Sequence, residues 1–356
     1  FAAYRDTKKQ FFDFLPKSAF ALVNMDDKNG SFMVQNTKAH KKSYALENYA
    51  DFRAQILEHQ FTGMLLKVDS QELWTQLIGA FNASNLLAVY AVAILMEQDS
   101  LETLAGISKL KNVSGRFETI QGPKGSLVIV DYAHTPDALK NVLKTINSVR
   151  TKNEKVITVV GCGGDRDQGK RPKMAAIAAQ MSDCVVFTSD NPRSESPEQI
   201  ISDMEAGVAP EDYKKTLRIS DRKEAIKAAC MLLSDKDILL VAGKGHETIQ
   251  EIGKKKIFSS DKKIILNAIK TKNLTLSNNL KANIINELSG EKKISPKAFL
   301  KQGRINSQEI NKKDIFFAIR GKKNNGNKFI SEAFKKKASI AIVNTINKNF
   351  NKKHQV

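Results

Sequence analysis

The sequence lacks the features that mark a membrane-spanning, disulfide-bonded or secreted protein. The best candidate for a membrane helix, NLLAVYAVAILM (85–96), falls short of the roughly 18–20 apolar residues required, so we expect a buried core helix there. The three cysteines form no CxxC pair, which disfavours a disulfide framework and a zinc site. The N-terminus has no basic segment followed by an apolar one. We therefore expect a cytoplasmic protein without membrane insertion.

A starting methionine is also missing, because the sequence opens with FAAYRDTKKQ. We expect that it begins inside a larger protein. The length of 356 residues predicts two or three domains. Hydrophobic residues at 41% and charged residues at 27% are usual for globular chains, which argues against wholesale disorder.

Acidic residues are scarce in the C-terminal part of the chain. Residues 271–356 carry 19 Lys and Arg against 5 Asp and Glu, with 14 Asn, whereas residues 1–270 are close to balanced. Such lysine clusters can attract nucleic acid phosphates. They are interleaved here with strand-like apolar runs and come with few arginines, which favours a solvated lysine-rich surface. We expect no nucleic acid partner, and a domain boundary near residues 270–279.

Between about 113 and 270, β-branched runs alternate with amphipathic stretches, which predicts a doubly wound parallel sheet of the α/β class. The predicted strands are SLVIVDY (126–132), VITVVG (156–161), CVVFTSD (184–190), TLRIS (216–220) and DILLVAG (237–243). Helix starts lie between them, marked by Thr135 before Pro136, by Ser196 with Gln199 and by Asp221 with Glu224.

Polar clusters follow four of these runs, and the carboxyl ends of parallel strands share one edge, where ligands collect. The clusters are DYAHTPD (131–137), GCGGDRDQGKRP (161–172), SDNPR (189–193) and GKGHE (243–247). Arg166 and Arg193 can bind carboxylates bidentately, and Asn191, Glu247 and backbone carbonyls can receive ammonium groups. The pattern predicts a pocket for an amino acid with more than one carboxylate and at least one amine.

Two nucleotide-binding motifs are absent or defective. Gly164 to Lys170 satisfies GxxxxGK, but Arg171 replaces the Ser or Thr that would hold magnesium, and Asp165 and Asp167 would face phosphate oxygens. We therefore reject this loop as a triphosphate cradle. No GxGxxG follows the first strand of the sheet, which disfavours a nicotinamide dehydrogenase.

In order along the chain, FNASN (81–85), GRFE (115–118), DYAHTPDAL (131–139), GCGGDRDQGKRP, DNPR and GKGHE resemble the Mur ligase family, specifically its diaminopimelate-adding members. The resemblance covers about residues 1–268. It implies that residues 1–112 form the last part of a P-loop-type α/β ATPase domain and residues 113–268 a Rossmann-like domain that binds the amino acid. The uridine-nucleotide domain and a GTNGKT-type phosphate loop are missing from the sequence.

The resemblance implies an ATP-dependent amide ligase of peptidoglycan precursor synthesis, working through an acyl phosphate. Its partners would be UDP-N-acetylmuramoyl-L-alanyl-D-glutamate and meso-diaminopimelate, and its cofactors ATP and Mg²⁺. Lys8 matches the lysine that the family carbamylates to help hold magnesium. The positions implied for ATP are Asn82, Asn85, Arg116, Asp131 and His134, with Arg116 reaching the phosphates, Asp131 the ribose and His134 the adenine.

The diaminopimelate pocket is implied for Arg166, Asp190, Asn191, Arg193, Gly243 and Glu247. Diaminopimelate carries a second carboxylate that lysine lacks, so an arginine at that end of the pocket would form an ion pair with diaminopimelate and not with lysine. The family's lysine-adding members depart from DNPR, which makes Arg193 the most informative residue of the chain.

Residues 304–344 resemble the N-terminal domain of MurF, the Mur ligase that next adds D-Ala-D-Ala. The stretch INSQ (305–308) lacks the Asp and Arg of the usual TDSR, which puts uridine-nucleotide binding in doubt. We expect residues 269–356 to be a truncated, small α/β domain of this kind, and the chain to be a monomeric fragment of a fusion without ligase turnover of its own. A non-catalytic diaminopimelate-binding module is the alternative, and a basic nucleic-acid-binding protein comes third.

Overall fold

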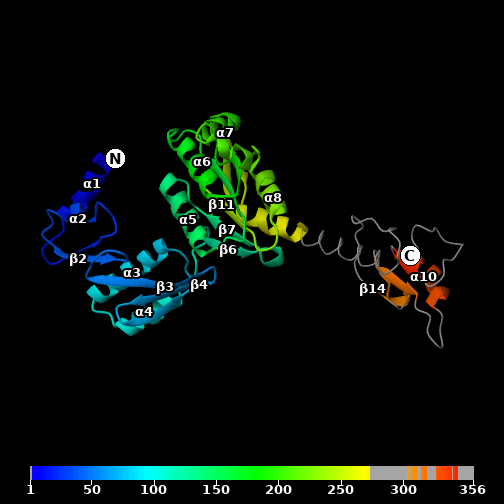
Figure 1. The fold of residues 1–356 in the computed structure, drawn as a ribbon, viewed down its shortest axis with the longest axis horizontal. Helices are drawn as coiled ribbons and strands as arrows, with labels where there is room; N and C mark the ends of the chain where they lie inside the picture. The colour runs from blue at the N-terminus through cyan, green and yellow to red at the C-terminus, as the bar shows by residue number, and fades with distance from the viewer. Residues whose placement is uncertain are drawn as a thin grey trace. The chain divides into compact units, whose positions relative to one another are not determined.

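A computed structural model describes residues 2–272, together with 303–304, 307–310, 314–318, 326–338 and 340–343. The chain divides into two compact units, Phe1–Ile265 and Leu266–Val356. The first unit, coloured blue to yellow in Figure 1, contains two large sheets, one on each side of residue 112 along the chain, and a two-stranded hairpin. No helix in the described part of the chain is long and apolar enough to cross a membrane.

The first sheet has the order β1-β2-β3-β4-β5, with β1 to β3 parallel and β3 to β5 antiparallel. Its strands are β1 (Phe20–Asn24), β2 (His40–Ala45), β3 (Phe52–Gln60), β4 (Gly63–Val68) and β5 (Gln71–Thr75). Helix α1 (Ala2–Asp13) precedes the sheet, α2 (Gly30–Met33) lies between β1 and β2 along the chain, and α3 (Ala80–Leu95) and α4 (Ser100–Ser108) follow the sheet. Leu66 and Leu73 of the sheet share one core with Leu87 of α3 and Ile107 of α4.

The helix expected at 85–96 is present, but it is buried on one face only. Helix α3 begins five residues earlier than the apolar run, at Ala80, and ends at Leu95. Its inner face is buried at Leu87 and Tyr90, but Val89 and Val92 on the opposite face remain about half exposed. An apolar run has no periodicity to separate a buried face from an exposed one, so burial on all sides could not be excluded from the sequence.

The second sheet confirms the predicted doubly wound α/β architecture. Its order is β10-β9-β8-β11-β7-β6, parallel except for β6 (Glu118–Gln121), an antiparallel edge strand that the sequence analysis missed. All five predicted strands are present: β7 (Leu127–Asp131), β8 (Val156–Cys162), β9 (Cys184–Ser189), β10 (Thr216–Arg218) and β11 (Ile238–Ala242). The central strands β7, β8 and β11 are buried at every residue, which explains why their sequences are apolar apart from Thr158 in β8 and Asp131 at the end of β7.

Helices cover both faces of this sheet (Figure 1), with α5, α6 and α7 on one side and α8 on the other. They are α5 (Pro136–Val149), α6 (Lys170–Met181), α7 (Pro197–Glu205) and α8 (Arg222–Leu232). The three predicted N-caps are confirmed, because the side chains of Thr135, Ser196 and Asp221 each accept a hydrogen bond from the backbone N–H three residues on.

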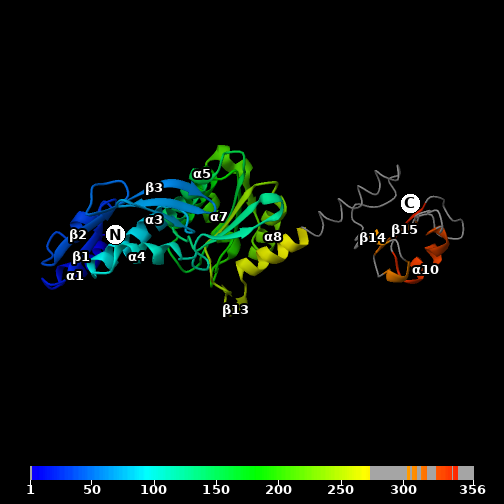
Figure 2. The same cartoon turned by 90° about the horizontal axis from the view of Figure 1, so that it is seen from below.

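A two-stranded hairpin, β12 (Ile249–Ile252) and β13 (Lys255–Phe258), follows the last strand of the second sheet (Figure 2). In the second unit, β14 (Gly303–Arg304), β15 (Ile315–Ala318) and β16 (Ile340–Val343) form a small parallel sheet. Helix α10 (Ile330–Lys335) lies between β15 and β16 in sequence and shares a core with β15 through Ile330 and Phe316. Of the INSQ stretch, 305 and 306 lie outside the described residues.

Candidate amino-acid pocket

A cavity of about 530 Å³ lies at the carboxyl ends of β7, β8, β9 and β11. It forms there because the backbone leaves the parallel sheet at these ends and the loops diverge from one another. The polar clusters predicted from the sequence supply its lining, namely Tyr132, His134, Thr135, Gly163, Arg166, Asp167, Lys170, Asp190, Asn191, Arg193, Gly243 and Glu247.

The structure brings the whole expected diaminopimelate set into this one cavity, and it adds His134 from the expected ATP set. Arg116, Asp131, Asn82 and Asn85 do not line it. Lys8 lines a separate cavity in the first half of the unit. The expected amino-acid set is therefore gathered in one place, whereas the expected ATP set is spread over several.

Arg193 is held in place by two neighbouring segments. Its Nε donates to Glu251 Oε2 of the β12 strand at 3.1 Å, and its Nη1 donates to the Gly164 carbonyl at 2.8 Å. The backbone of Arg193 adopts a positive φ of 51° and bridges Ile252 of the same strand. These contacts use Nε and one N–H of Nη1, so the second N–H of Nη1 and both N–H groups of Nη2 remain for a carboxylate in the cavity.

Arg171, which follows the GxxxxGK motif where a phosphate loop has Ser or Thr, forms buried ion pairs. Its side chain is completely buried, and it donates to Glu195 Oε1 and Asp203 Oδ2, each at 2.8 Å. Glu195 Oε1 also accepts the N–H of Asp165 at 2.6 Å. Instead of holding magnesium, this position ties the loop that carries Arg166 to the loop that carries Arg193.

Lys244 is a functional candidate that the sequence analysis passed over within GKGHE. Its ammonium is fully buried and donates to Asn191 Oδ1 at 3.0 Å, Glu247 Oε2 at 3.3 Å and the Ile249 carbonyl at 2.6 Å. Asn191 Oδ1 also accepts the N–H of Glu251, so both of its lone pairs are used. In this structure the Asn191 oxygen is occupied by these two donors, and its contact with a substrate ammonium stays a prediction.

Gly243 and Asp190, which both line the cavity, are packed against each other. A side chain at Gly243 would place its Cβ 2.8 Å from Asp190 Oδ2, and the φ of +114° also favours glycine. Burial raises the pKa of the Asp190 carboxyl, while the charges of Arg222 and Lys244 act in the opposite direction. Glycine at this position thus lets a buried carboxyl approach the backbone of the GKGHE turn.

Two of the expected nucleotide residues, Arg116 and His134, lie together with His246 beside the ring of Tyr132. The Arg116 guanidinium lies 4.6 Å from its centroid, and the rings of His134 and His246 lie 4.7 and 5.6 Å from it. Burial raises the pKa of the Tyr132 hydroxyl, and the neighbouring Glu247 carboxylate adds to this. Tyr132 therefore stands between the Arg116 loop and the amino-acid cavity.

Asp131 is buried, and its two oxygens accept the backbone N–H groups of Phe117 and Ala133, each at 2.7 Å. Burial raises the pKa of its carboxyl, although these bonds oppose the change. In this structure Asp131 holds the loop that carries Arg116 against the end of β7. The contact of Asp131 with the ribose stays a prediction. On α3, Asn82 donates to the Ile78 carbonyl at 2.8 Å, and Asn85 is exposed.

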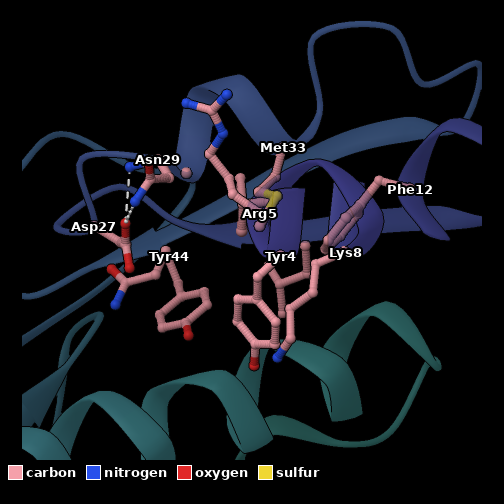
Figure 3. Close-up of a pocket in the computed structure, with 12 residues that line it drawn as sticks. Tyr4, Arg5, Lys8, Phe12, Asp27, Asn29, Met33 and Tyr44 are labelled. Atoms are coloured by element: carbon pink, nitrogen blue, oxygen red, sulfur yellow. Dashed lines mark hydrogen bonds between the residues drawn. The ribbon is translucent and has the colours of Figure 1, made fainter. Parts of the chain in front are cut away.

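Lys8 lines a cavity of about 570 Å³ together with Tyr4, Asp27, Asn29 and Tyr44 (Figure 3). Its ammonium lies 5.0 Å from the Tyr4 ring, and the two side chains run alongside each other. An ammonium cannot bind a metal, and the described residues contain no group of three acidic, His or Cys side chains able to hold one. A carbamate on Lys8 would suit Mg²⁺, which takes one or two carboxylates in addition to substrate phosphates.

Comparison with known families gives two matches that follow each other along the chain. Residues 1–93 match the Mur ligase middle domain, and residues 115–245 match the Mur ligase glutamate ligase domain. Over 262 residues the chain is 55% identical to the UDP-N-acetylmuramoyl-L-alanyl-D-glutamate–2,6-diaminopimelate ligase of Phocaeicola vulgatus, covering 74% of this chain and 54% of that protein. The enzyme of the same name from Geobacillus kaustophilus is 43% identical over 256 residues, which cover 70% of this chain and 52% of that protein.

Solved structures agree with the sequence matches. A structure of a UDP-N-acetylmuramoyl-L-alanyl-D-glutamate–2,6-diaminopimelate ligase aligns with a TM-score of 0.52 at 35% identity, covering 76% of this chain and 57% of that one. MurF from Acinetobacter baumannii aligns with a TM-score of 0.58 at 15% identity, over 76% of this chain and 55% of that one, and this likeness concerns the fold alone. The chain spans about half the length of the curated relatives it matches.

Proposed function

The chain belongs to the Mur ligase family through its middle and glutamate ligase domains, and from this premise we propose that it carries the amino-acid-binding side of an ATP-dependent ligase. The proposed ligase adds meso-diaminopimelate to UDP-N-acetylmuramoyl-L-alanyl-D-glutamate. The observation that carries the proposal is the convergence of Arg166, Arg193 and Glu247 on one cavity. Two guanidinium groups and a carboxylate match an amino acid with two carboxylates and an amine.

In the proposed reaction, the D-glutamyl γ-carboxylate attacks the γ-phosphorus of ATP, which releases ADP and leaves an acyl phosphate. The free amine of diaminopimelate then attacks the acyl carbon, forms the amide, and expels phosphate with loss of a proton from nitrogen. Magnesium, when bound with ATP, offsets the phosphate charge, and Lys8 as a carbamate would supply one oxygen ligand.

We propose that Arg193 and Arg166 hold the far carboxylate of diaminopimelate and that Glu247 receives an ammonium group. Arg116, Asn82, Asn85 and His134 are proposed to contact ATP, with Asp131 holding the Arg116 loop from inside. The contact of Phe81 with Phe117, whose ring centroids lie 6.2 Å apart, supports this because it joins the start of α3 to the Arg116 loop.

Titration calorimetry of the 356-residue chain with meso-diaminopimelate tests the proposal. We expect Arg193→Ala to weaken binding on the order of 30- to 1,000-fold, the equivalent of about 2–4 kcal/mol for truncating a charged hydrogen-bonded group. Arg218→Ala is the matched control, because Arg218 forms an ion pair with Glu205 and does not line the cavity. Equal affinity of Arg193→Ala and the unmutated chain would overturn the assignment.

A further inference from the structure

The ammonium of Lys244 lies among three residues that line the cavity, Asp190, Asn191 and Glu247. Besides its bonds to Asn191, Glu247 and the Ile249 carbonyl, it lies 3.9 Å from Asp190 Oδ1. The side chain has no exposed surface, so it cannot itself contact a ligand. Any influence on binding must therefore pass through the groups that it holds.

Burying an unpaired ammonium is strongly unfavourable, so a fully buried lysine indicates a site with compensating charge. Asp190 and Glu247 supply two carboxylates for the one ammonium of Lys244. The side chain of Glu247 is 34% exposed and lines the cavity, so its carboxylate is within reach of a ligand.

The orientation of Glu247 depends on the same group. Its Oε2 accepts from Lys244 and also from Asn191 Nδ2 at 3.4 Å, while Asn191 is turned this way because Lys244 and the Glu251 N–H occupy its oxygen. Without Lys244 the amide would lose one of the two bonds that fix its direction. The carboxylate of Glu247 would lose its charged partner.

We infer that Lys244 is a positioning residue, whose buried ammonium holds Glu247 and Asn191 in the arrangement that receives an ammonium group of the substrate. The inference rests on the proposed function, since it assigns a task within the same pocket. It predicts that Lys244 affects recognition of the amine more than recognition of the carboxylates, which Arg166 and Arg193 bind from other loops.

Two ligands separate these effects, because pimelate has the two carboxylates of diaminopimelate and neither amine. We expect Lys244→Met in the 356-residue chain to raise the Kd for meso-diaminopimelate at least about tenfold and that for pimelate less than about twofold, measured by calorimetry and competition. Lys9→Met is the matched control, because Lys9 is also buried and pairs with Asp13 at 2.6 Å, away from this cavity.

Equal weakening of both ligands by Lys244→Met would overturn the inference in favour of a purely structural role, and so would unchanged binding of both. A second test uses nuclear magnetic resonance to follow the ¹H–¹⁵N signals of the buried lysine ammonium groups in the unmutated chain. The signal that disappears in Lys9→Met is assigned to Lys9, which distinguishes it from that of Lys244. Meso-diaminopimelate should shift the Lys244 signal and pimelate should not. A chain that binds no diaminopimelate would instead refute the proposed function itself.

Discussion

Arg171 and Glu195 form an ion pair of 2.8 Å in which the arginine is completely buried, and this pair joins the two loops that carry Arg166 and Arg193. Glu195 lies two residues beyond Arg193 and also accepts the N–H of Asp165. A contact outside the cavity therefore fixes the distance between the two arginines inside it.

Replacing Arg171 by methionine should destabilise the first unit by about 3 kcal/mol, because it leaves Glu195 and Asp203 without their buried partner. Urea unfolding followed by circular dichroism measures this loss. The control is Arg218→Met, since Arg218 is 38% exposed and its pair with Glu205 should contribute less than about 1 kcal/mol. Similar losses in the two variants would contradict the role given to Arg171.

Gly243→Ala should destabilise the chain by more than about 1 kcal/mol and abolish diaminopimelate binding. The new Cβ would lie 2.8 Å from Asp190 Oδ2, and the φ of +114° adds strain. The same substitution at Gly106, within α4 and with no atom within 4 Å of the new Cβ, should instead stabilise by about 0.5–1 kcal/mol. Thermal unfolding of both variants measures these changes in stability. An equal change in stability for Gly243→Ala and Gly106→Ala would contradict this account.

The carboxylate of Asp183 should make stability depend on pH in the acid range. Burial alone would raise its pKa, but hydrogen bonds from the Val156 N–H at 2.8 Å and from Arg150 at 2.7 Å hold the pKa below its usual value. When the pKa of a carboxyl is lower in the folded state, its ionised form stabilises the folded protein at pH values above the unfolded-state pKa of about 3.9. This stabilisation is lost as the pH falls through the folded-state pKa.

Asp183→Asn should therefore lower the free energy of unfolding by about 1 kcal/mol at pH 7, a modest figure because the side chain is 45% exposed. The difference from the unmutated chain should shrink as pH falls below about 4. Urea unfolding at pH 7 and pH 3 measures it. Asp235→Asn is the control, since Asp235 is 65% exposed and pairs with the exposed Lys124. A constant difference for Asp183→Asn would contradict the assignment.

The second sheet and its ligand edge could be predicted because their physical causes are local in sequence. Fully buried parallel strands are nearly all apolar, as β11 is throughout and β8 is apart from Thr158, and their carboxyl ends share an edge. The helix caps were predictable for the same reason, since Thr135 and Asp221 each bond to a backbone N–H three residues away.

What could not be predicted depends on contacts between distant segments. Lys244 looks like a surface lysine until Asn191, 53 positions away in sequence, is seen to accept from it. The partner of Arg193 is Glu251, 58 positions on, in a hairpin whose alternation is obscured by Lys254 to Lys256. The use of Asp131 inside the protein depends likewise on Phe117, which belongs to a loop without its own pattern.

The central claim is that the cavity selects a second carboxylate, and the ratio of the Kd values for L-lysine and meso-diaminopimelate on the 356-residue chain tests it most directly. L-lysine has both amines and one carboxylate of diaminopimelate but lacks the second carboxylate, which is the group assigned to Arg193. The account predicts that diaminopimelate binds about 100-fold more tightly, measured by titration calorimetry. Affinities within about threefold of each other would contradict it.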